Sequence, residues 1–224
     1  MAISFINSSA DGTHTIIKQA LETALVKKQR VLWVITGGSG IKIVVKVMSE
    51  ISDEASKQLA VLLGDERFGP VNHKDSNLRQ LYEAGFDAKH AIVVPVLRPK
   101  TNLEETVKRY GEAAETAFTA AGTVIAQLGM GADGHIAGVL PESPATKLSK
   151  QWTVGYKAKD FTRLTLTPFA LQRANQIYVA AFGKAKRTAL SNLRDKQLSI
   201  AEQPAQLVKA VEKSYIINDQ LGDV

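Results

Sequence analysis

Two patterns of apolar and polar residues alternate along the chain. Short apolar runs, typical of buried strands, are separated by longer stretches in which apolar residues recur every three or four positions, as in an amphipathic helix. The short runs predict strands over residues 31–35, 59–63, 92–96, 123–128, 163–167, 176–182 and 214–217. The longer stretches predict helices over residues 9–28, 41–51, 75–85, 102–121 and 185–193, the fourth of them with Asn102 as its N-cap.

Strands that alternate with helices predict an α/β fold, because parallel strands need crossover connections that cover the sheet. We therefore expect an α/β fold with a mainly parallel sheet and helices on both faces. Neither an internal repeat nor a linker interrupts the pattern, which predicts a single domain over residues 1–224. In the last third, the spacing of Tyr156, Arg163, Thr165 and Thr167 predicts some antiparallel or edge character.

Composition narrows the class of protein. The 224 residues are 45% hydrophobic and 22% charged, as in ordinary globular proteins. No apolar run approaches the roughly 20 residues that a membrane helix needs, so we expect no membrane partner. Residues 1–11 show no secretory signal, which favours a cytoplasmic location. Cysteine is absent, which excludes disulfides, thiolate catalysis and Cys-ligated zinc.

The net charge of +6 favours an anionic partner. Phosphorylated metabolites and nucleic acids both have the required charge. The chain has neither a run of five or six basic residues nor an RNA-binding aromatic motif. We therefore expect a small anionic ligand and no nucleic acid. Lys184, Lys186 and Arg187 form the only mild basic cluster, which a solvated helix face would also explain.

The most informative segment is the glycine-rich turn after the predicted strand 123–128, because it carries Asp133 and His135 together. Histidine is suited to proton transfer near neutral pH, and an aspartate two residues away can orient it. Alternatively, Asp133-Gly134 forms a plain turn and His135 lies near the start of a helix. No second histidine stands at metal-ligand spacing, and no Gly-x-Ser-x-Gly motif supplies a nucleophilic serine.

Three further segments at predicted strand ends could bind an anion. Residues 36–40, Thr-Gly-Gly-Ser-Gly, join a strand to a helix and lack the Walker Lys-Ser/Thr ending, but their backbone N–H groups can still hold phosphate. Arg67 follows Asp65 and Glu66 at another strand end and can hold phosphate bidentately, or the three can form a surface ion pair. Ser76 and Asn77 follow shortly afterwards, and Ser76 alone would serve as an N-cap.

Taken in order, these segments resemble the 6-phosphogluconolactonase family, within the wider superfamily of sugar-phosphate isomerases and deaminases. The resemblance covers about residues 30 to 190. The matching segments are Gly37-Gly38-Ser39, Asp65-Glu66-Arg67 with Ser76-Asn77, residues 129–135, residues 163–167 and residues 183–186.

The resemblance implies a three-layer, modified Rossmann-like, mainly parallel sheet with helices on both faces. It also implies hydrolysis of 6-phosphoglucono-1,5-lactone to 6-phosphogluconate without a cofactor or metal. His135 would be the general base that activates water, and Asp133 would orient the water or the imidazole. Arg163 would either bind substrate or stabilise the sheet edge. The other residues implied in substrate or phosphate binding are Gly37, Gly38, Ser39, Asp65, Arg67, Ser76, Asn77 and Lys186.

The chain also departs from the family pattern. Gly40 stands where the glycine loop usually ends in threonine, and Ile136-Ala137 after the histidine resembles the related glucosamine-6-phosphate deaminases. Those deaminases carry a glutamate where this chain has Leu140, and a tyrosine where it has Arg67. Both differences favour a lactonase. An amino-sugar-phosphate deaminase or isomerase and a non-catalytic sugar-phosphate sensor remain alternatives, and the sequence leaves monomer and dimer equally open.

Overall fold

The computed structural model describes residues 2–27, 29–147 and 150–222. Its main sheet has seven strands in the order β1-β10-β9-β6-β2-β3-β5, and the described pairs are parallel. The mainly parallel sheet expected from the sequence is confirmed. The strands are β1 (Ala2–Asn7), β2 (Val31–Ile35), β3 (Leu59–Leu63), β5 (Ile92–Val94), β6 (Thr123–Gly129), β9 (Gln176–Ala181) and β10 (Lys213–Asn218).

The predicted helices are all present, with small shifts at their ends. Ser9 caps the first helix, and Asn102 and Glu105 form a reciprocal capping box on the fifth, as its N-cap prediction required. The α-helices are α1 (Ala10–Leu25), α2 (Ile41–Glu50), α3 (Asp53–Ser56), α4 (Asn77–Glu83), α5 (Leu103–Ala120), α6 (Pro168–Leu171) and α7 (Arg187–Asp195). The 3-10 turns are η1 (Gly38–Gly40), η2 (Pro144–Thr146), η3 (Lys184–Lys186) and η4 (Pro204–Ala210).

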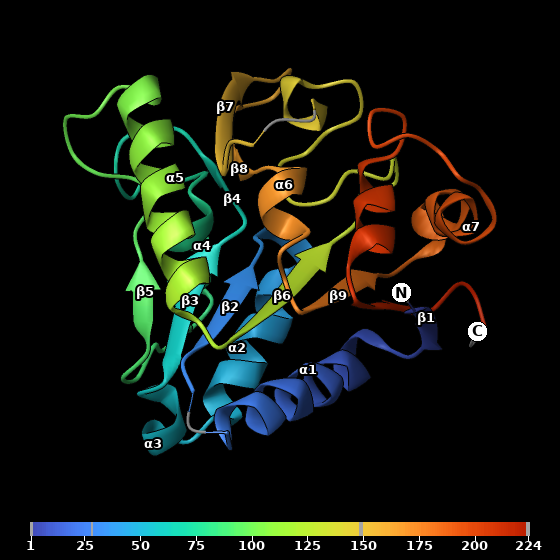
Figure 1. Cartoon of the computed structure of the whole chain (residues 1–224), viewed down its shortest axis with the longest axis horizontal. Coiled ribbons are helices and arrows are strands. Elements are labelled where there is room, and N and C mark those ends of the chain that lie inside the picture. The colour runs from blue at the N-terminus through green and yellow to red at the C-terminus, as the bar shows by residue number, and fades with distance from the viewer. Residues whose placement is uncertain (1, 28, 148–149, 223–224) are drawn as a thin grey trace.

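The order of the strands places helices on both faces. The chain crosses the sheet in one direction from β1 through β2 and β3 to β5, and then returns through β6 and β9 to β10. Because crossover connections are right-handed, α1 and α2 cover one face, and α5, α6 and α7 cover the other. Figure 1 shows α1 and α2 packed side by side and α5 standing next to a second, smaller sheet. Every residue of β2 is buried, as in a strand that is covered on both faces.

The reversal of direction falls between β2 and β6, which are neighbours in the sheet. The connections that leave the carboxyl ends of these two strands run to opposite faces, so a crevice opens between them. In open α/β sheets this switch point is where ligands bind. The two glycine-rich segments, 36–40 and 129–134, leave β2 and β6 at this crevice.

The second sheet has the order β4-β8-β7 and is antiparallel. Its strands are β4 (Asp65–Arg67), β7 (Thr153–Lys157) and β8 (Thr162–Leu166). The antiparallel character expected in the last third is confirmed, whereas no strand was predicted over residues 65–67, which form β4. Only Gly64 separates β3 from β4, so the small sheet stands directly on the carboxyl edge of the main sheet.

Candidate active site

A cavity of about 270 Å³ occupies the crevice between β2 and β6. The loops at the carboxyl ends of β2, β6 and β9 form part of its wall, and the small sheet forms the rest. Of the residues selected from the sequence, those that line it are Gly37, Gly38, Ser39, Asp65, Arg67, Asn77, His135, Arg163 and Lys186. Five lining residues were not selected: Thr36, Gly129, Met130, Gly131 and Ala137. They could have been predicted from their positions next to the selected residues in the same turns.

Asp133 holds the ring of His135 although it does not itself line the cavity. Its Oδ1 lies 2.7 Å from His135 Nδ1 and accepts a hydrogen bond from the His135 backbone N–H at 3.0 Å. The contact with His135 lowers the pKa of Asp133 to about 2, so Asp133 is ionised at neutral pH. An ionised carboxylate only accepts hydrogen bonds, so the neutral imidazole carries its proton on Nδ1 and leaves the lone pair on Nε2.

The Asp133–His135 pair is part of a tight loop and not of a helix. Two isolated bridges, Met130 to Ile136 and Ile136 to Val139, fold the segment back on itself, so the interpretation of His135 as a helix start is wrong. Gly131 lies directly under the pair. A Cβ atom there would stand 2.1 Å from His135 Nδ1 and 2.4 Å from Asp133 Oδ1, so only glycine permits this approach.

One face of the small sheet carries the charged wall of the cavity. Side chains alternate along a strand, and the register pairs Asp65 with Thr165 and Arg67 with Arg163, so all four share a face. Arg67 Nη1 donates to the Asp75 carbonyl at 2.8 Å, and Arg163 Nη2 donates to Asp160 Oδ2 at 2.6 Å. The Nε atoms of both arginines are buried and have no hydrogen-bond partner among the described residues.

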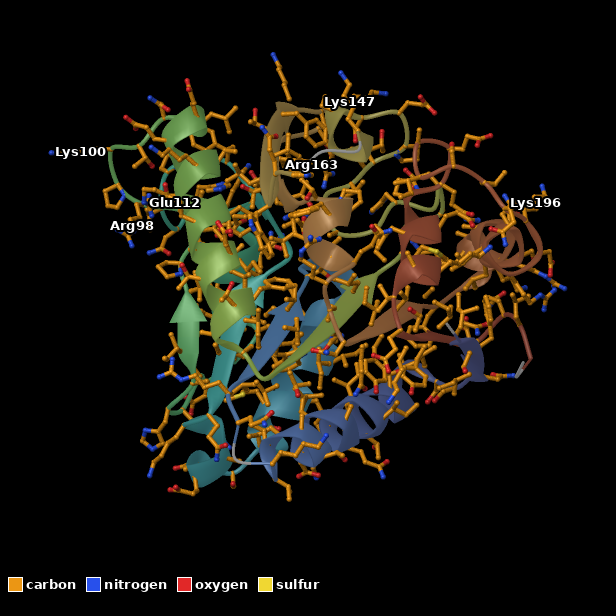
Figure 2. The ribbon with its side chains drawn as sticks, viewed as in Figure 1. Arg98, Lys100, Glu112, Lys147, Arg163 and Lys196 are labelled. Atoms are coloured by element: carbon orange, nitrogen blue, oxygen red, sulfur yellow. The ribbon has the colours of Figure 1, made fainter. Side chains whose placement is uncertain are left out.

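Figure 2 shows Arg163 on the inside of the ribbon, whereas Lys100 and Lys196 extend from its periphery. Arg163 is 8% exposed. A buried guanidinium with an unused donor beside a cavity is suited to an anionic ligand.

Glu66 points to the opposite side of β4 and is buried behind the cavity. Its carboxylate accepts hydrogen bonds from the backbone N–H of Arg67, Asn77 and Leu78 at 2.7, 2.6 and 3.1 Å. The Ser76 hydroxyl also donates to it, at 3.0 Å. Burial raises the pKa of Glu66 although these bonds favour its charged form. Glu66 therefore fixes the start of α4 against β4.

Ser76 has a structural role. It is the N-cap of α4, accepting from the Arg79 backbone N–H at 3.2 Å, and it does not line the cavity. Among the sequence alternatives, the geometry is that of the N-cap.

Asn77 connects the charged wall to the glycine loop. Its Nδ2 donates to the Asp65 carbonyl at 2.9 Å, and a Cβ on Gly37 would stand 2.1 Å from its Oδ1. The loop after β2 is therefore packed directly on the first residue of α4. Burial raises the pKa of Asp65, while the nearby Arg67 and Arg163 charges oppose this rise.

The glycine loop and Lys186 complete the cavity. Gly38 has φ +66°, a left-handed conformation that glycine adopts without strain, and it opens the 3-10 turn η1 that leads into α2. Thr36 Oγ1 accepts from the Gly129 N–H at 3.2 Å, which joins the loops after β2 and β6. Lys186 ends η3 after β9, and within the described part of the chain its ammonium has no ion-pair partner. N–H groups at a helix start together with a nearby cation favour a bound anion.

Within residues 2–27, 29–147 and 150–222, no helix is long and apolar enough to cross a bilayer. The same residues contain no group of three potential metal-ligating side chains.

Comparison with known proteins identifies one family. The model of the family described as glucosamine-6-phosphate isomerases/6-phosphogluconolactonase matches residues 7–217. A 6-phosphogluconolactonase from Caulobacter vibrioides is 31% identical over 203 residues, covering 85% of each chain. One from a Synechocystis species is 29% identical over 177 residues, covering 75% of this chain and 73% of that one.

Solved structures show the same fold. The 6-phosphogluconolactonase of Thermotoga maritima superimposes with a TM-score of 0.83 at 21% identity, covering 97% of this chain and 99% of that chain. The enzyme of Trypanosoma brucei superimposes with a TM-score of 0.78 at 18% identity, covering 98% and 96%.

Proposed function

This chain belongs to the glucosamine-6-phosphate isomerase/6-phosphogluconolactonase family, and we propose that it hydrolyses 6-phospho-D-glucono-1,5-lactone to 6-phospho-D-gluconate. This reaction is the second step of the oxidative pentose phosphate route. One observation carries the proposal: an imidazole whose Nδ1 is held by an ionised carboxylate lines the same cavity as Arg67, Arg163 and Lys186.

His135 acts as general base in this reaction. Its Nε2 takes a proton from a water molecule, and the water oxygen forms a bond to the lactone carbonyl carbon. When the tetrahedral intermediate collapses, the bond from that carbon to the ring oxygen breaks. The imidazolium returns its proton to the ring oxygen, which becomes a hydroxyl. The new carboxyl group carries the second proton of the water and releases it to solvent, which gives the carboxylate. A positioned base supplies roughly 10²–10⁴-fold of rate, and Asp133 stabilises the imidazolium.

The cationic side chains that line the cavity hold the phosphate away from the reacting carbon. Arg67, Arg163 and Lys186 supply positive charge, and the start of η1 supplies backbone N–H groups. Contacts with the remote phosphate place the lactone carbonyl beside His135, and they are the same before and during the reaction. A covalent nucleophile is unnecessary, because a lactone is already an activated ester.

The deaminase alternative lacks a proton-transfer group. Leu140 occupies the position at which the related deaminases carry glutamate, and a leucine side chain cannot move protons. The retained Asp133–His135 pair argues against a sensor that only binds, because recognition of a sugar phosphate does not need a general base.

The test follows lactone loss at mildly acidic pH, where spontaneous hydrolysis is slow. Lactone is generated in situ from glucose 6-phosphate and added to wild type, to His135→Ala or to buffer. The proposal expects rapid loss with wild type only. A parallel reaction with glucosamine 6-phosphate measures ammonia release. Lactone loss equal to that in buffer would overturn the proposal, and ammonia release in its place would establish a deaminase.

A further inference from the structure

The ring of Phe161 lies against both cavity arginines. Its centroid is 5.0 Å from Arg67 Cζ and 5.8 Å from Arg163 Cζ, distances at which a guanidinium is attracted to an aromatic face. Phe161 is partly buried and does not itself line the cavity. Nothing in the reaction described above uses it.

The strand pattern explains why the ring stands there. Phe161 directly precedes β8 and is two residues before Arg163, so both side chains project to the same face. Arg67 is the cross-strand partner of Arg163, which makes Phe161 its diagonal neighbour. A turn fixes the backbone, because Ala158 N–H donates to the Phe161 carbonyl at 2.8 Å and Phe161 N–H donates to Asp160 Oδ1 at 2.9 Å.

The two arginines need such a support. Like charges directly opposite each other on paired strands repel. Long arginine side chains can also adopt many other rotamers, in which the two guanidiniums would move apart. Each guanidinium has one fixed contact of its own, Arg67 to the Asp75 carbonyl and Arg163 to Asp160. One contact leaves the plane of a guanidinium free to rotate. The Phe161 ring beside both guanidiniums restricts that rotation. The buried Nε donors still have no partner among the described residues.

We infer that Phe161 is a positioning residue that holds Arg67 and Arg163 as a preformed pair for a doubly charged phosphoryl group. The inference rests on the proposed function for the identity of the phosphate ester, whereas the geometry of the pair does not depend on it. Because the phosphate is remote from the reacting carbon, the ring governs binding of phosphorylated ligands and leaves the chemical step unchanged.

The experiment compares variants that keep or remove the ring. In Phe161→Leu and Phe161→Met, KM for the phosphorylated lactone should rise about tenfold, equivalent to about 1.4 kcal/mol, with kcat unchanged. Phe161→Tyr keeps the ring and should restore the wild-type KM. For unphosphorylated glucono-1,5-lactone, kcat/KM should be the same in all four proteins.

Phe169→Leu is the matched control. The Phe169 ring also lies against an arginine, with Arg173 Cζ 3.4 Å from its centroid, but neither residue lines the cavity. Its removal should leave KM for the phosphorylated lactone unchanged. An equal rise in KM for Phe169→Leu and Phe161→Leu would overturn the inference, because the effect would then be general to loss of an aromatic ring.

A second readout separates this inference from the proposed function. Calorimetry measures binding of inorganic phosphate and of glucose 6-phosphate to wild type and to the Phe161 variants, without any reaction. If wild type fails to hydrolyse lactone but binds phosphate, and Phe161→Leu weakens that binding about tenfold, the proposed function fails and the inference stands. Unchanged phosphate affinity in correctly folded Phe161→Leu and Phe161→Met would overturn the inference.

Discussion

A side chain at Gly40 is expected to stabilise the protein. Gly40 has φ −75° and ψ −17°, ordinary right-handed helical values, and it is buried at the start of α2. An added Cβ would stand 3.9 Å from Gln127 Nε2 and 3.9 Å from Thr36 Oγ1, which are ordinary contacts. Gly40→Ala therefore keeps the native backbone and removes freedom from the unfolded chain, a gain of about 0.4–1 kcal/mol.

A hydroxyl at this position should add more. Gln127 is 2% exposed, its Nε2 donates to the Gly40 carbonyl at 3.4 Å, and its Oε1 is buried without a partner among the described residues. An unsatisfied buried acceptor costs about 1–3 kcal/mol. A serine hydroxyl beside this amide can donate to it, so Gly40→Ser should exceed Gly40→Ala by about 1 kcal/mol. Threonine, usual here in the family, should behave similarly.

Urea unfolding of wild type, Gly40→Ala and Gly40→Ser measures the gain from the methyl group and the further gain from the hydroxyl. In thermal unfolding, the melting temperature should rise by about 2–4 °C for each kcal/mol in a chain of this size. KM should stay unchanged, because Gly40 does not line the cavity. A less stable Gly40→Ala would contradict the steric reasoning. A Gly40→Ser no more stable than Gly40→Ala would contradict the assignment of Gln127 Oε1 as an unsatisfied acceptor.

Three other substitutions test the carboxylates of Glu66, Asp133 and Asp65. Glu66→Gln should lower the free energy of unfolding in urea by about 2–4 kcal/mol, because an amide cannot accept all four donors that face this carboxylate; an unchanged value would contradict its capping role. Asp133→Asn should lower kcat about 10²–10⁴-fold with little change in KM. The stability that Asp133 contributes is present above its ordinary pKa of 3.8 and should be lost as pH falls through about 2. The free energies of unfolding of wild type and Asp133→Asn should therefore converge in acid. Burial raises the pKa of Asp65, so its ionisation opposes folding, and wild type should lose stability relative to Asp65→Asn as pH rises from acid to neutral; the opposite slope in urea unfolding would refute this.

The parallel sheet was predictable because its strands are buried on both faces and therefore form nearly continuous apolar runs. β4 was not predictable in this way. Its three residues are all charged, and they form a strand only because β8, about a hundred residues later, pairs with them. β1 and β7 are also missing from the sequence prediction, and both lie at sheet edges where one neighbour suffices. In each case the strand forms because it pairs with a segment far away in the sequence, and the local pattern of apolar residues does not indicate that pairing.

The candidate site also contains residues that the sequence could predict and residues that it could not. Gly37, Gly38 and His135, chosen because they lie on glycine turns at strand ends, line one cavity, since parallel strands bring their carboxyl ends to one edge. Ser76 looked like part of the cavity but faces Glu66, since its helix starts behind β4. Phe161 could have been found from its two-residue spacing to Arg163, but only once Arg67 was known to pair with that strand.

Lactone hydrolysis by His135→Gly, with and without added imidazole, directly tests the proposal that the His135 imidazole is the general base. At saturating 6-phosphoglucono-1,5-lactone, kcat should fall about 10²-fold or more, because the imidazole that takes the proton from water is gone. Imidazole in solution should restore part of the rate, since Gly131 and the vacated ring position leave room for it beside Asp133. A variant that hydrolyses the lactone as fast as wild type would show that His135 is not the base.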